Sequence, residues 1–211
     1  NNSYGKNLIG SFWQPRAVYC DSTFLQTLPK REFAAGVAEI VKMAVTFDKN
    51  FFEWLERHDL SDETNLKIAI HKSIAIKADV VSQDETEKGI RAVLNYGHTF
   101  AHVIENQTHY STYLHGEAVA IGMVMANTLA IKLNLLSAED ALRIKALLER
   151  YNLPTQYKID SLEAFYDAFF LDKKSANDKI TFILAKGIGG NDMRSDVAKE
   201  TVLEALGESH A

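Results

Sequence analysis

Two histidines stand four residues apart in the segment NYGHTFAHVIE, residues 95–105. If this segment is helical, His98 and His102 lie on one face, where two imidazoles can bind one zinc ion. His115 follows at the start of a second apolar segment, LHGEAVAIGMVMA. Spacing alone therefore predicts a zinc site formed by His98, His102 and His115.

The same spacing has two other interpretations. A lone buried histidine is most often a hydrogen-bonded core residue, and a histidine beside a metal can transfer protons instead of binding the ion. The segment also lacks the glutamate of the HExxH zinc motif. Spacing leaves three alternatives open: shared metal binding, a division between metal binding and proton transfer, or packing in the core.

A glutamate and a lysine stand three residues apart in AEIVK, residues 38–42. On a helix Glu39 and Lys42 would share one face, and their neighbours are almost all apolar. An exposed pair of this kind would be an ordinary ion pair, worth about 0.2–0.5 kcal/mol. Two buried charges need a further partner, such as a metal or an anion. Glu39 and Lys42 are therefore candidate site residues.

A set of cations and amides indicates an anion site. Arg91, Asn95, His98 and His102 follow one another at helical spacings, so one continuous helix would align them as a cradle for phosphate or carboxylate. The formal net charge of -5 argues against a nucleic-acid binder. Any bound anion must then be held by a local cluster. Further candidates are Lys77, Lys173 and Lys174, although spacing favours a solvated loop for the last two.

Helices must position most of these side chains. Pro29 suits a first helical turn, and the apolar residues 33–45 continue that helix. The pattern predicts further helices over residues 48–58, 62–82, 91–107, 115–133, 138–151, 161–170 and 196–206. It predicts strands over residues 17–21 and 179–185 and a turn at 187–190. Because the βαβαβ alternation of a nucleotide-binding domain is missing, the predicted fold is mostly α, a multi-helix domain with minor β-strands.

Composition limits the class of protein. The 211 residues, 46% hydrophobic, suffice for one large domain or for one domain and a fragment of another. Cys20 is the only cysteine, which excludes a disulfide framework and fits a reducing cytoplasm. No apolar run reaches the ~18 residues of a membrane span. The chain opens at Asn1 with neither Met nor a signal pattern, so we expect it to be part of a longer protein.

Six motifs, in this order, resemble one enzyme family. They are GKNLIGSFWQP, FLQTLPKREFAAGVAEIVK, IKADVVSQDE, RAVLNYGHTFAHVIE, LHGEAVAIGM and LDKK. Together they closely resemble 3-dehydroquinate synthase from Gly5 to about Lys186. The resemblance covers the C-terminal half of that enzyme and implies that the N-terminal NAD-binding half is missing. We expect residues 1–28 to be a connection from the nucleotide-binding domain and residues 29–211 to form the helical metal- and substrate-binding domain.

The resemblance selects among the alternatives for the histidines. In the family, the glutamate of AEIVK, the first histidine of GHTFAH and the histidine of LHGE bind the metal. This implies Glu39, His98 and His115 as ligands of zinc or cobalt. His102 is then no ligand, and is implied to lie beside the metal among the groups that bind substrate and move protons. Glu117 is expected to cap its helix rather than to support a ligand.

The resemblance also assigns positions for the substrate and for NAD. The basic side chains are implied to hold the substrate's carboxylate and phosphate. The implied catalytic residues are His102, Lys42, Arg91 and Asn95, and further substrate-binding residues are Asn7, Lys77 and Lys173. The residues implied to lie against NAD are Lys6, Phe24, Thr27, Leu28 and Glu32.

The implied reaction converts 3-deoxy-D-arabino-heptulosonate 7-phosphate to 3-dehydroquinate and phosphate, with transient oxidation by NAD and a catalytic zinc. The implied enzyme is a cytoplasmic, homodimeric lyase of the shikimate pathway, which supplies aromatic amino acids. Two alternatives remain: another sugar-phosphate cyclase, and a metal- and NAD-dependent polyol dehydrogenase of the glycerol dehydrogenase type. The chain by itself is expected to be inactive, because it lacks the NAD-binding half.

Overall fold

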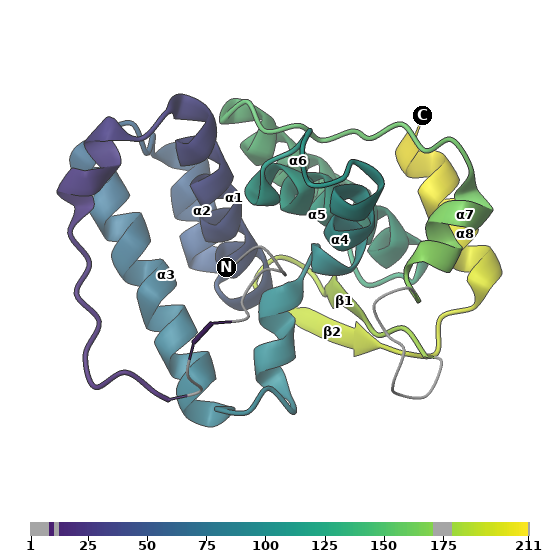
Figure 1. Ribbon diagram of the computed structural model, residues 1–211, viewed down its shortest axis with the longest axis horizontal. Coiled ribbons are helices and arrows are strands. Elements are labelled where there is room, and N and C mark those ends of the chain that lie inside the picture. The colour runs from purple at the N-terminus through teal and green to yellow at the C-terminus, as the bar shows by residue number, and fades with distance from the viewer. Residues whose placement is uncertain (1–8, 11–12, 171–178, 211) are drawn as a thin grey trace.

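Helix α5 (His115–Lys132) runs through the middle of the structure (Figure 1). The computed structural model describes residues 9–10, 13–170 and 179–210. Thirteen of the 18 residues of α5 are buried, on all sides of the helix, which is typical of a helix enclosed by others. Its neighbours are α1 (Lys30–Phe47), α4 (His98–Gln107), α6 (Ala138–Arg150), α8 (Lys199–His210) and strand β1 (Phe182–Ala185).

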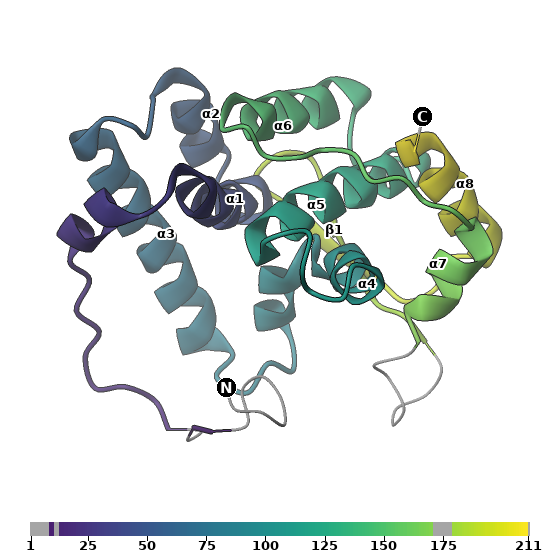
Figure 2. The same ribbon diagram turned by 45° about the horizontal axis from the view of Figure 1, so that its top comes forward.

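Two glycines allow neighbouring helices to approach α5 closely. A Cβ atom at Gly116 would lie 2.1 Å from the carbonyl oxygen of Ala35 on α1. A Cβ atom at Gly122 would lie 2.1 Å from the carbonyl oxygen of Gly97, the residue before α4. Neither distance leaves room for a side chain. The first half of α5 is therefore in direct backbone contact with both α1 and α4, which lie beside it in Figure 2.

The segment before α4 is not a continuation of that helix. The 3-10 helix η2 (Ile90–Asn95) ends before Tyr96, and Gly97 has a φ of 82° where α4 begins. Glycine adopts this left-handed conformation without the steric cost that a Cβ atom brings. The single helix predicted over residues 91–107 is therefore wrong, because the chain turns at Gly97.

The outer helices begin at side chains that accept hydrogen bonds from the first helical turn. Such capping residues satisfy backbone N–H groups that have no partner within the helix. The caps are Asp48 of α2 (Lys49–Arg57), Asp62 of α3 (Glu63–Gln83), Ser137 of α6 and Ser161 of α7 (Leu162–Ala168). The helices predicted over residues 48–58, 62–82, 138–151 and 161–170 are thus confirmed to within three residues at each end.

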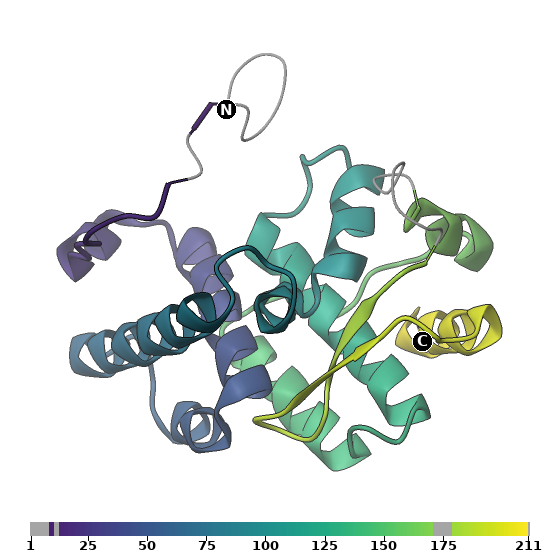
Figure 3. The same cartoon turned by 90° about the horizontal axis from the view of Figure 1, so that it is seen from below.

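A two-stranded antiparallel sheet crosses the underside of the helices (Figure 3). Strand β1 pairs with β2 (Asn191–Arg194), with Phe182 opposite Arg194. All four residues of β1 are buried, and the ring of Phe182 packs against those of Phe100 and Phe169. The strand predicted over residues 179–185 is confirmed for its last four residues. Strand β2 was not predicted, because NDMR lacks the alternation of a half-buried strand.

The strand predicted over residues 17–21 is wrong. These residues belong to no helix or strand, and Val18 and Tyr19 are 72% and 95% exposed. A strand needs a neighbouring strand to accept and donate its backbone hydrogen bonds, and the described residues place none beside this segment. The 3-10 helix η1 (Ser22–Thr27) follows it, capped by Asp21.

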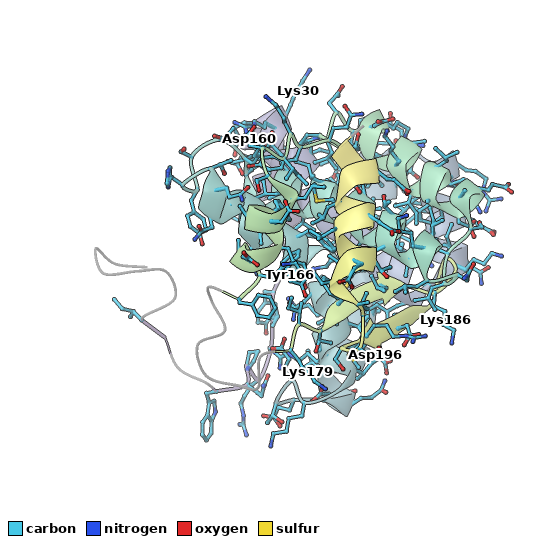
Figure 4. The ribbon with its side chains drawn as sticks, turned by 90° about the vertical axis from the view of Figure 1, so that its right-hand side faces the viewer. Lys30, Asp160, Tyr166, Lys179, Lys186 and Asp196 are labelled. Carbon is cyan, nitrogen blue, oxygen red and sulfur yellow. The ribbon has the colours of Figure 1, made fainter. Side chains whose placement is uncertain are left out.

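The C-terminal helix α8 covers one side of the molecule next to α7 (Figure 4). Nζ of Lys199 lies 4.8 Å from the ring centroid of Tyr166, which is labelled there on α7. Within the described ranges, no helix is both long enough and apolar enough to cross a lipid bilayer. The mostly helical architecture with a minor β component confirms the predicted fold class.

Candidate metal centre

Three side chains from three different helices meet at the N-terminus of α5. Glu39 comes from α1, His98 is the first residue of α4, and His115 is the first residue of α5. Oε1 of Glu39 lies 4.0 Å from Nε2 of His98 and 4.0 Å from Nε2 of His115. One potential ligand atom from each residue lies within 4.8 Å of the other two. Helix packing thus brings together residues that are far apart in the sequence.

The two carboxylate oxygens of Glu39 have different surroundings. Oε2 accepts a hydrogen bond from Nζ of buried Lys42 at 2.6 Å. Oε1 is buried and has no hydrogen-bond partner. The 4.0 Å separations from the histidine nitrogens are too long for hydrogen bonds, and an unpaired buried carboxylate oxygen is costly.

A metal ion fits this arrangement. One carboxylate and two imidazoles are common donors for a catalytic zinc, which binds each of them at roughly 2.0–2.2 Å. Ligand atoms around a tetrahedral ion then lie about 3.3–3.6 Å apart, so side-chain movements of roughly 0.5 Å would bring the pairs at Glu39, now 4.0 Å apart, to binding distance. An ion at this point would also satisfy Oε1 of Glu39.

The charges of Glu39 and His98 also favour a cation. Burial raises the pKa of Glu39, but the charge and hydrogen bond of Lys42, with His98 and His115, outweigh it and hold the pKa below its usual value. Burial and the charge of Lys42 lower the pKa of His98 to about 4. At neutral pH the carboxylate is therefore ionised and the His98 imidazole neutral, the forms in which both groups bind metals.

His102 contacts a different carboxylate. Its Nδ1 lies 3.1 Å from Oε2 of Glu105, and Nδ1 of His115 lies 2.9 Å from Oε1 of the same residue. Burial raises the pKa of Glu105, but the hydrogen bonds from the two histidines lower it to about 2. The three potential ligand atoms that lie within 4.8 Å of one another come from Glu39, His98 and His115, and none comes from His102. The three-histidine cluster suggested by spacing is therefore not the one that the fold assembles.

An arginine fixes the N-terminus of α5, where His115 lies. Nε and Nη2 of Arg31 each donate to one oxygen of Glu117 at 2.6 Å, and Nη2 also donates to the carbonyl oxygen of Thr112 at 2.7 Å. Glu117 accepts in addition from the backbone N–H of Leu114 at 2.8 Å. Glu117 thus caps the helix as expected.

The predicted cradle of cations and amides is divided by the turn at Gly97. Arg91 and Asn95 lie on η2, so they do not share one helical face with His98 and His102. Arg91 donates to the carbonyl oxygen of Glu85, and Asn95 Nδ2 donates to Glu87 Oε1 at 2.7 Å.

Asn95 nevertheless lies beside the two histidines. With His98, His102 and Thr99 it lines a pocket of about 410 Å³. The pocket therefore borders one of the three candidate ligands, His98, and carries polar side chains on a partly apolar wall. Lys77 is exposed on α3. The pKa of Lys42 is lowered mainly by burial, and the nearby positive charge of Lys77 also lowers it.

The residues expected to lie against NAD occupy an exposed edge. Phe24 and Thr27 lie on η1, Leu28 follows it, and Glu32 lies in the first turn of α1, all exposed. Leu28 lines an apolar groove of about 750 Å³ between η1, α1 and α3. Three further expected site residues lie outside the described residues: Lys6, Asn7 and Lys173.

The sequence reasoning missed two of the residues that position the centre, Glu105 and Arg31. Glu105 stands three residues after His102, a spacing that places the two side chains side by side on a helix and that could have identified it. Arg31 offers no such signal, because its partner Glu117 is 86 residues away.

Two family models match the chain. The model for the C-terminal part of 3-dehydroquinate synthase matches residues 36–175, and the model for the N-terminal part matches residues 1–35. A curated 3-dehydroquinate synthase from Nitratiruptor sp. is 62% identical over 208 residues, which are 99% of this chain and 60% of that protein. The chain therefore spans about 60% of the length of that relative.

Solved structures of sugar-phosphate cyclases have a similar fold. A 2-epi-5-epi-valiolone synthase from Streptomyces hygroscopicus with NAD+ and Zn2+ bound has a TM-score of 0.79 at 26% identity, over 89% of this chain and 54% of that one. A 2-deoxy-scyllo-inosose synthase complexed with carbaglucose-6-phosphate, NAD+ and Co2+ has a TM-score of 0.79 at 27% identity, over 99% of this chain and 60% of that one.

Proposed function

The chain belongs to the 3-dehydroquinate synthase family, and we therefore propose that it carries the metal- and substrate-binding part of a 3-dehydroquinate synthase. The proposed reaction converts 3-deoxy-D-arabino-heptulosonate 7-phosphate to 3-dehydroquinate and phosphate, with NAD oxidising the substrate transiently. The 62% identity to a 3-dehydroquinate synthase, against 26% and 27% to two other cyclases, favours this substrate over theirs.

The observation that carries the proposal is the unpaired oxygen of Glu39. It is buried, ionised and equidistant from two imidazole nitrogens, an arrangement that supports Glu39, His98 and His115 as the metal ligands. Zinc or cobalt bound there would act as a Lewis acid on substrate hydroxyl and carbonyl oxygens. Both metals remain candidates because this donor set accepts either.

The surrounding side chains have distinct tasks in the proposal. Lys42 keeps one oxygen of Glu39 paired, and its buried ammonium lies close enough to His98 for its charge to lower the pKa of that residue. Arg91 and Lys77 supply positive charge for the substrate's carboxylate and phosphate. Asn95 orients substrate hydroxyls from the wall of the pocket, and His102, on the same pocket, moves protons.

NAD is proposed to lie against the exposed edge formed by Phe24, Thr27, Leu28 and Glu32. None of the described elements forms a parallel sheet able to hold a dinucleotide, so the nucleotide would be held mainly by a separate binding domain. We place the protein in the reducing cytoplasm on the basis of its single cysteine. We expect these 211 residues alone to bind metal without turning over the substrate.

Titration of zinc into metal-free protein tests the proposed ligands. The native chain is expected to bind one equivalent. Glu39→Gln removes the anionic donor. Loss of a residue that only supports a ligand typically weakens metal binding about 10–100-fold, and loss of this ligand should weaken zinc binding by more. His102→Ala is the matched control and should keep the native affinity, because His102 is not a ligand.

Two results would contradict the assignment. Loss of zinc in His102→Ala with full binding in Glu39→Gln would restore the three-histidine site. No binding by the native chain would remove the metal centre from the proposal. Phosphate release from the proposed substrate, measured with NAD and zinc on a protein that includes the nucleotide-binding domain, tests the reaction itself.

A further inference from the structure

Glu105 joins two histidines that have different proposed tasks. The residue lies on α4 and is 5% exposed. Oε1 lies 2.9 Å from Nδ1 of His115, a proposed metal ligand, and Oε2 lies 3.1 Å from Nδ1 of His102, which lines the pocket. No lysine or arginine pairs with this carboxylate among the described ion pairs. Both of its oxygens are therefore used by histidines.

A carboxylate in this position determines which ring nitrogen carries the proton. A carboxylate oxygen can only accept, so each histidine must donate from Nδ1–H. Nε2 of His115 then has a free lone pair, and this is the nitrogen 4.0 Å from Oε1 of Glu39. In His102 the same contact leaves Nε2 as the ring nitrogen available to a bound molecule.

We propose that Glu105 is a positioning residue that holds both His102 and His115 as Nδ1–H tautomers, so that one carboxylate prepares the metal ligand and the proton-transfer histidine together. The inference rests on the proposed metal centre for the role of His115. A hydrogen bond from the outer nitrogen of a metal-binding histidine to a carboxylate orients the ring and makes it a better donor. Here the carboxylate has a second histidine on its other oxygen.

Glu105→Gln is the sharpest test because glutamine has the same shape. Its amide has one accepting oxygen and one donating nitrogen, so it can accept from only one of the two histidines. The other histidine must turn its ring or change to the Nε2–H tautomer. If that histidine is His115, its Nε2 can no longer bind a metal.

The first readout is the tautomer of each histidine in metal-free protein, measured from the ring 15N chemical shifts at neutral pH. Native protein is expected to show Nδ1–H for both His102 and His115, and Glu105→Gln should convert at least one to Nε2–H. This readout does not require a metal, so it remains decisive if Glu39, His98 and His115 fail to bind zinc. Native protein with Nε2–H at His102 and His115 would overturn the inference.

The second readout is zinc affinity. Glu105→Gln should weaken binding about 10–100-fold, as is typical for the loss of a group that supports a ligand. Glu63→Gln is the matched control: Glu63 is exposed, its ion pair among the described residues is with Lys67, and the variant should bind like native protein. Native affinity and unchanged tautomers in Glu105→Gln would overturn the inference while leaving the metal centre intact.

Glu105→Asp provides a second variant if the glutamine substitution affects folding. Aspartate keeps the charge but is shorter by one methylene, so it should reach one histidine and not both. The expected result is one retained Nδ1–H tautomer and a zinc affinity between those of native protein and Glu105→Gln. If Glu105→Asp matched native protein in both tautomers and zinc affinity, simultaneous contact with His102 and His115 would not be required. That result would contradict the inference.

Discussion

Two buried side chains among the described residues leave a polar atom without a hydrogen bond: Glu39 at Oε1 and Asn127 at Nδ2. The first is accounted for by the proposed metal. The second, Nδ2 of Asn127, belongs to a side-chain amide on α5. The oxygen of the same amide accepts a hydrogen bond from the hydroxyl of fully buried Tyr96. Burial raises the pKa of Tyr96 well above its usual value, so the phenol stays neutral and donates. This hydrogen bond satisfies the hydroxyl of Tyr96 and the oxygen of Asn127, whereas Nδ2 of Asn127 has no partner among the described residues.

Tyr96→Phe should destabilise the protein by about 1–3 kcal/mol. The substitution leaves the buried oxygen of Asn127 without a donor, and the cost is that of an unsatisfied buried group rather than of an average hydrogen bond. Urea unfolding of native and variant protein, with equal slopes in denaturant, measures the difference.

The double variant Tyr96→Phe/Asn127→Leu is the control. It removes both partners and fills the site with apolar groups, so it should recover most of the lost stability. A stability of Tyr96→Phe within about 0.5 kcal/mol of native protein would show that Asn127 finds another donor. No recovery in the double variant would show that the loss comes from packing.

The chemistry of individual residues was only partly predictable from the sequence. The contact between Glu39 and Lys42 was expected from their spacing, and the structure confirms it, with Lys42 buried and Glu39 partly exposed. The inclusion of Glu39 with two distant histidines depends on how α1, α4 and α5 pack. Spacing within one segment carries no information on that packing, so spacing alone favoured His102 instead.

The helices α1, α4 and α5 meet because two residues of α5 have no side chain. Gly116 allows contact with α1, which carries Glu39, and Gly122 allows contact with the start of α4, which carries His98. The distance between the ligand atoms is therefore set by backbone contacts, which cannot adjust as side chains do. The centre should be more sensitive to these glycines than to its apolar lining.

Gly122→Ala should destabilise the protein by about 1–3 kcal/mol, the usual cost of overfilling a packed core. The added methyl would meet the carbonyl oxygen of Gly97 at 2.1 Å and push α4 from α5. His98 moves with α4, so zinc affinity should fall in the same variant. Chemical unfolding and zinc titration measure the two effects.

Gly36→Ala is the matched control, because a Cβ atom there meets nothing within 4 Å. Gly36 lies inside α1, where alanine is favoured over glycine by about 0.5–1 kcal/mol. This variant should gain that stability and keep native zinc affinity. Equal behaviour of the two alanine variants would contradict the role given to the contact at Gly122.

The helices themselves were largely predictable, since capping residues and apolar periodicity are local signals. The break at Gly97 and the missing strand at residues 17–21 both have non-local causes. The break at Gly97 allows the start of α4 to contact Gly122, which lies 25 residues further along the chain. The apolar periodicity continues through residues 91–107, so it gives no sign of this break. Residues 17–21 have the composition of a strand, but a strand forms only where a neighbouring strand is available.

Metal binding by three helices should stabilise the fold as a whole. An ion that binds only the native state raises the free energy of unfolding by about 2.7 kcal/mol at 100 times its dissociation constant. For a domain of this size, that corresponds to a rise of about 5–10 °C in Tm. Thermal unfolding monitored by circular dichroism, with and without zinc, measures the shift.

The Glu39→Gln variant separates site binding from weaker surface binding in this measurement. Its Tm should hardly change on addition of zinc at the same concentration. An equal rise in native protein and Glu39→Gln would assign the stabilisation to other residues, whereas no rise in either would show that zinc does not prefer the native state.

The central place of α5 also has a consequence for synthesis on the ribosome. The buried side chains of α1 pack against α5, yet 85 residues separate the last residue of α1 from the last residue of α5. At about 5–20 residues per second, the ribosome needs roughly 4–17 s to add them. We expect the nascent chain to present uncovered apolar helix faces for this time. Chaperones that bind such faces should therefore engage the chain before Lys132 emerges and release it once α5 is in place.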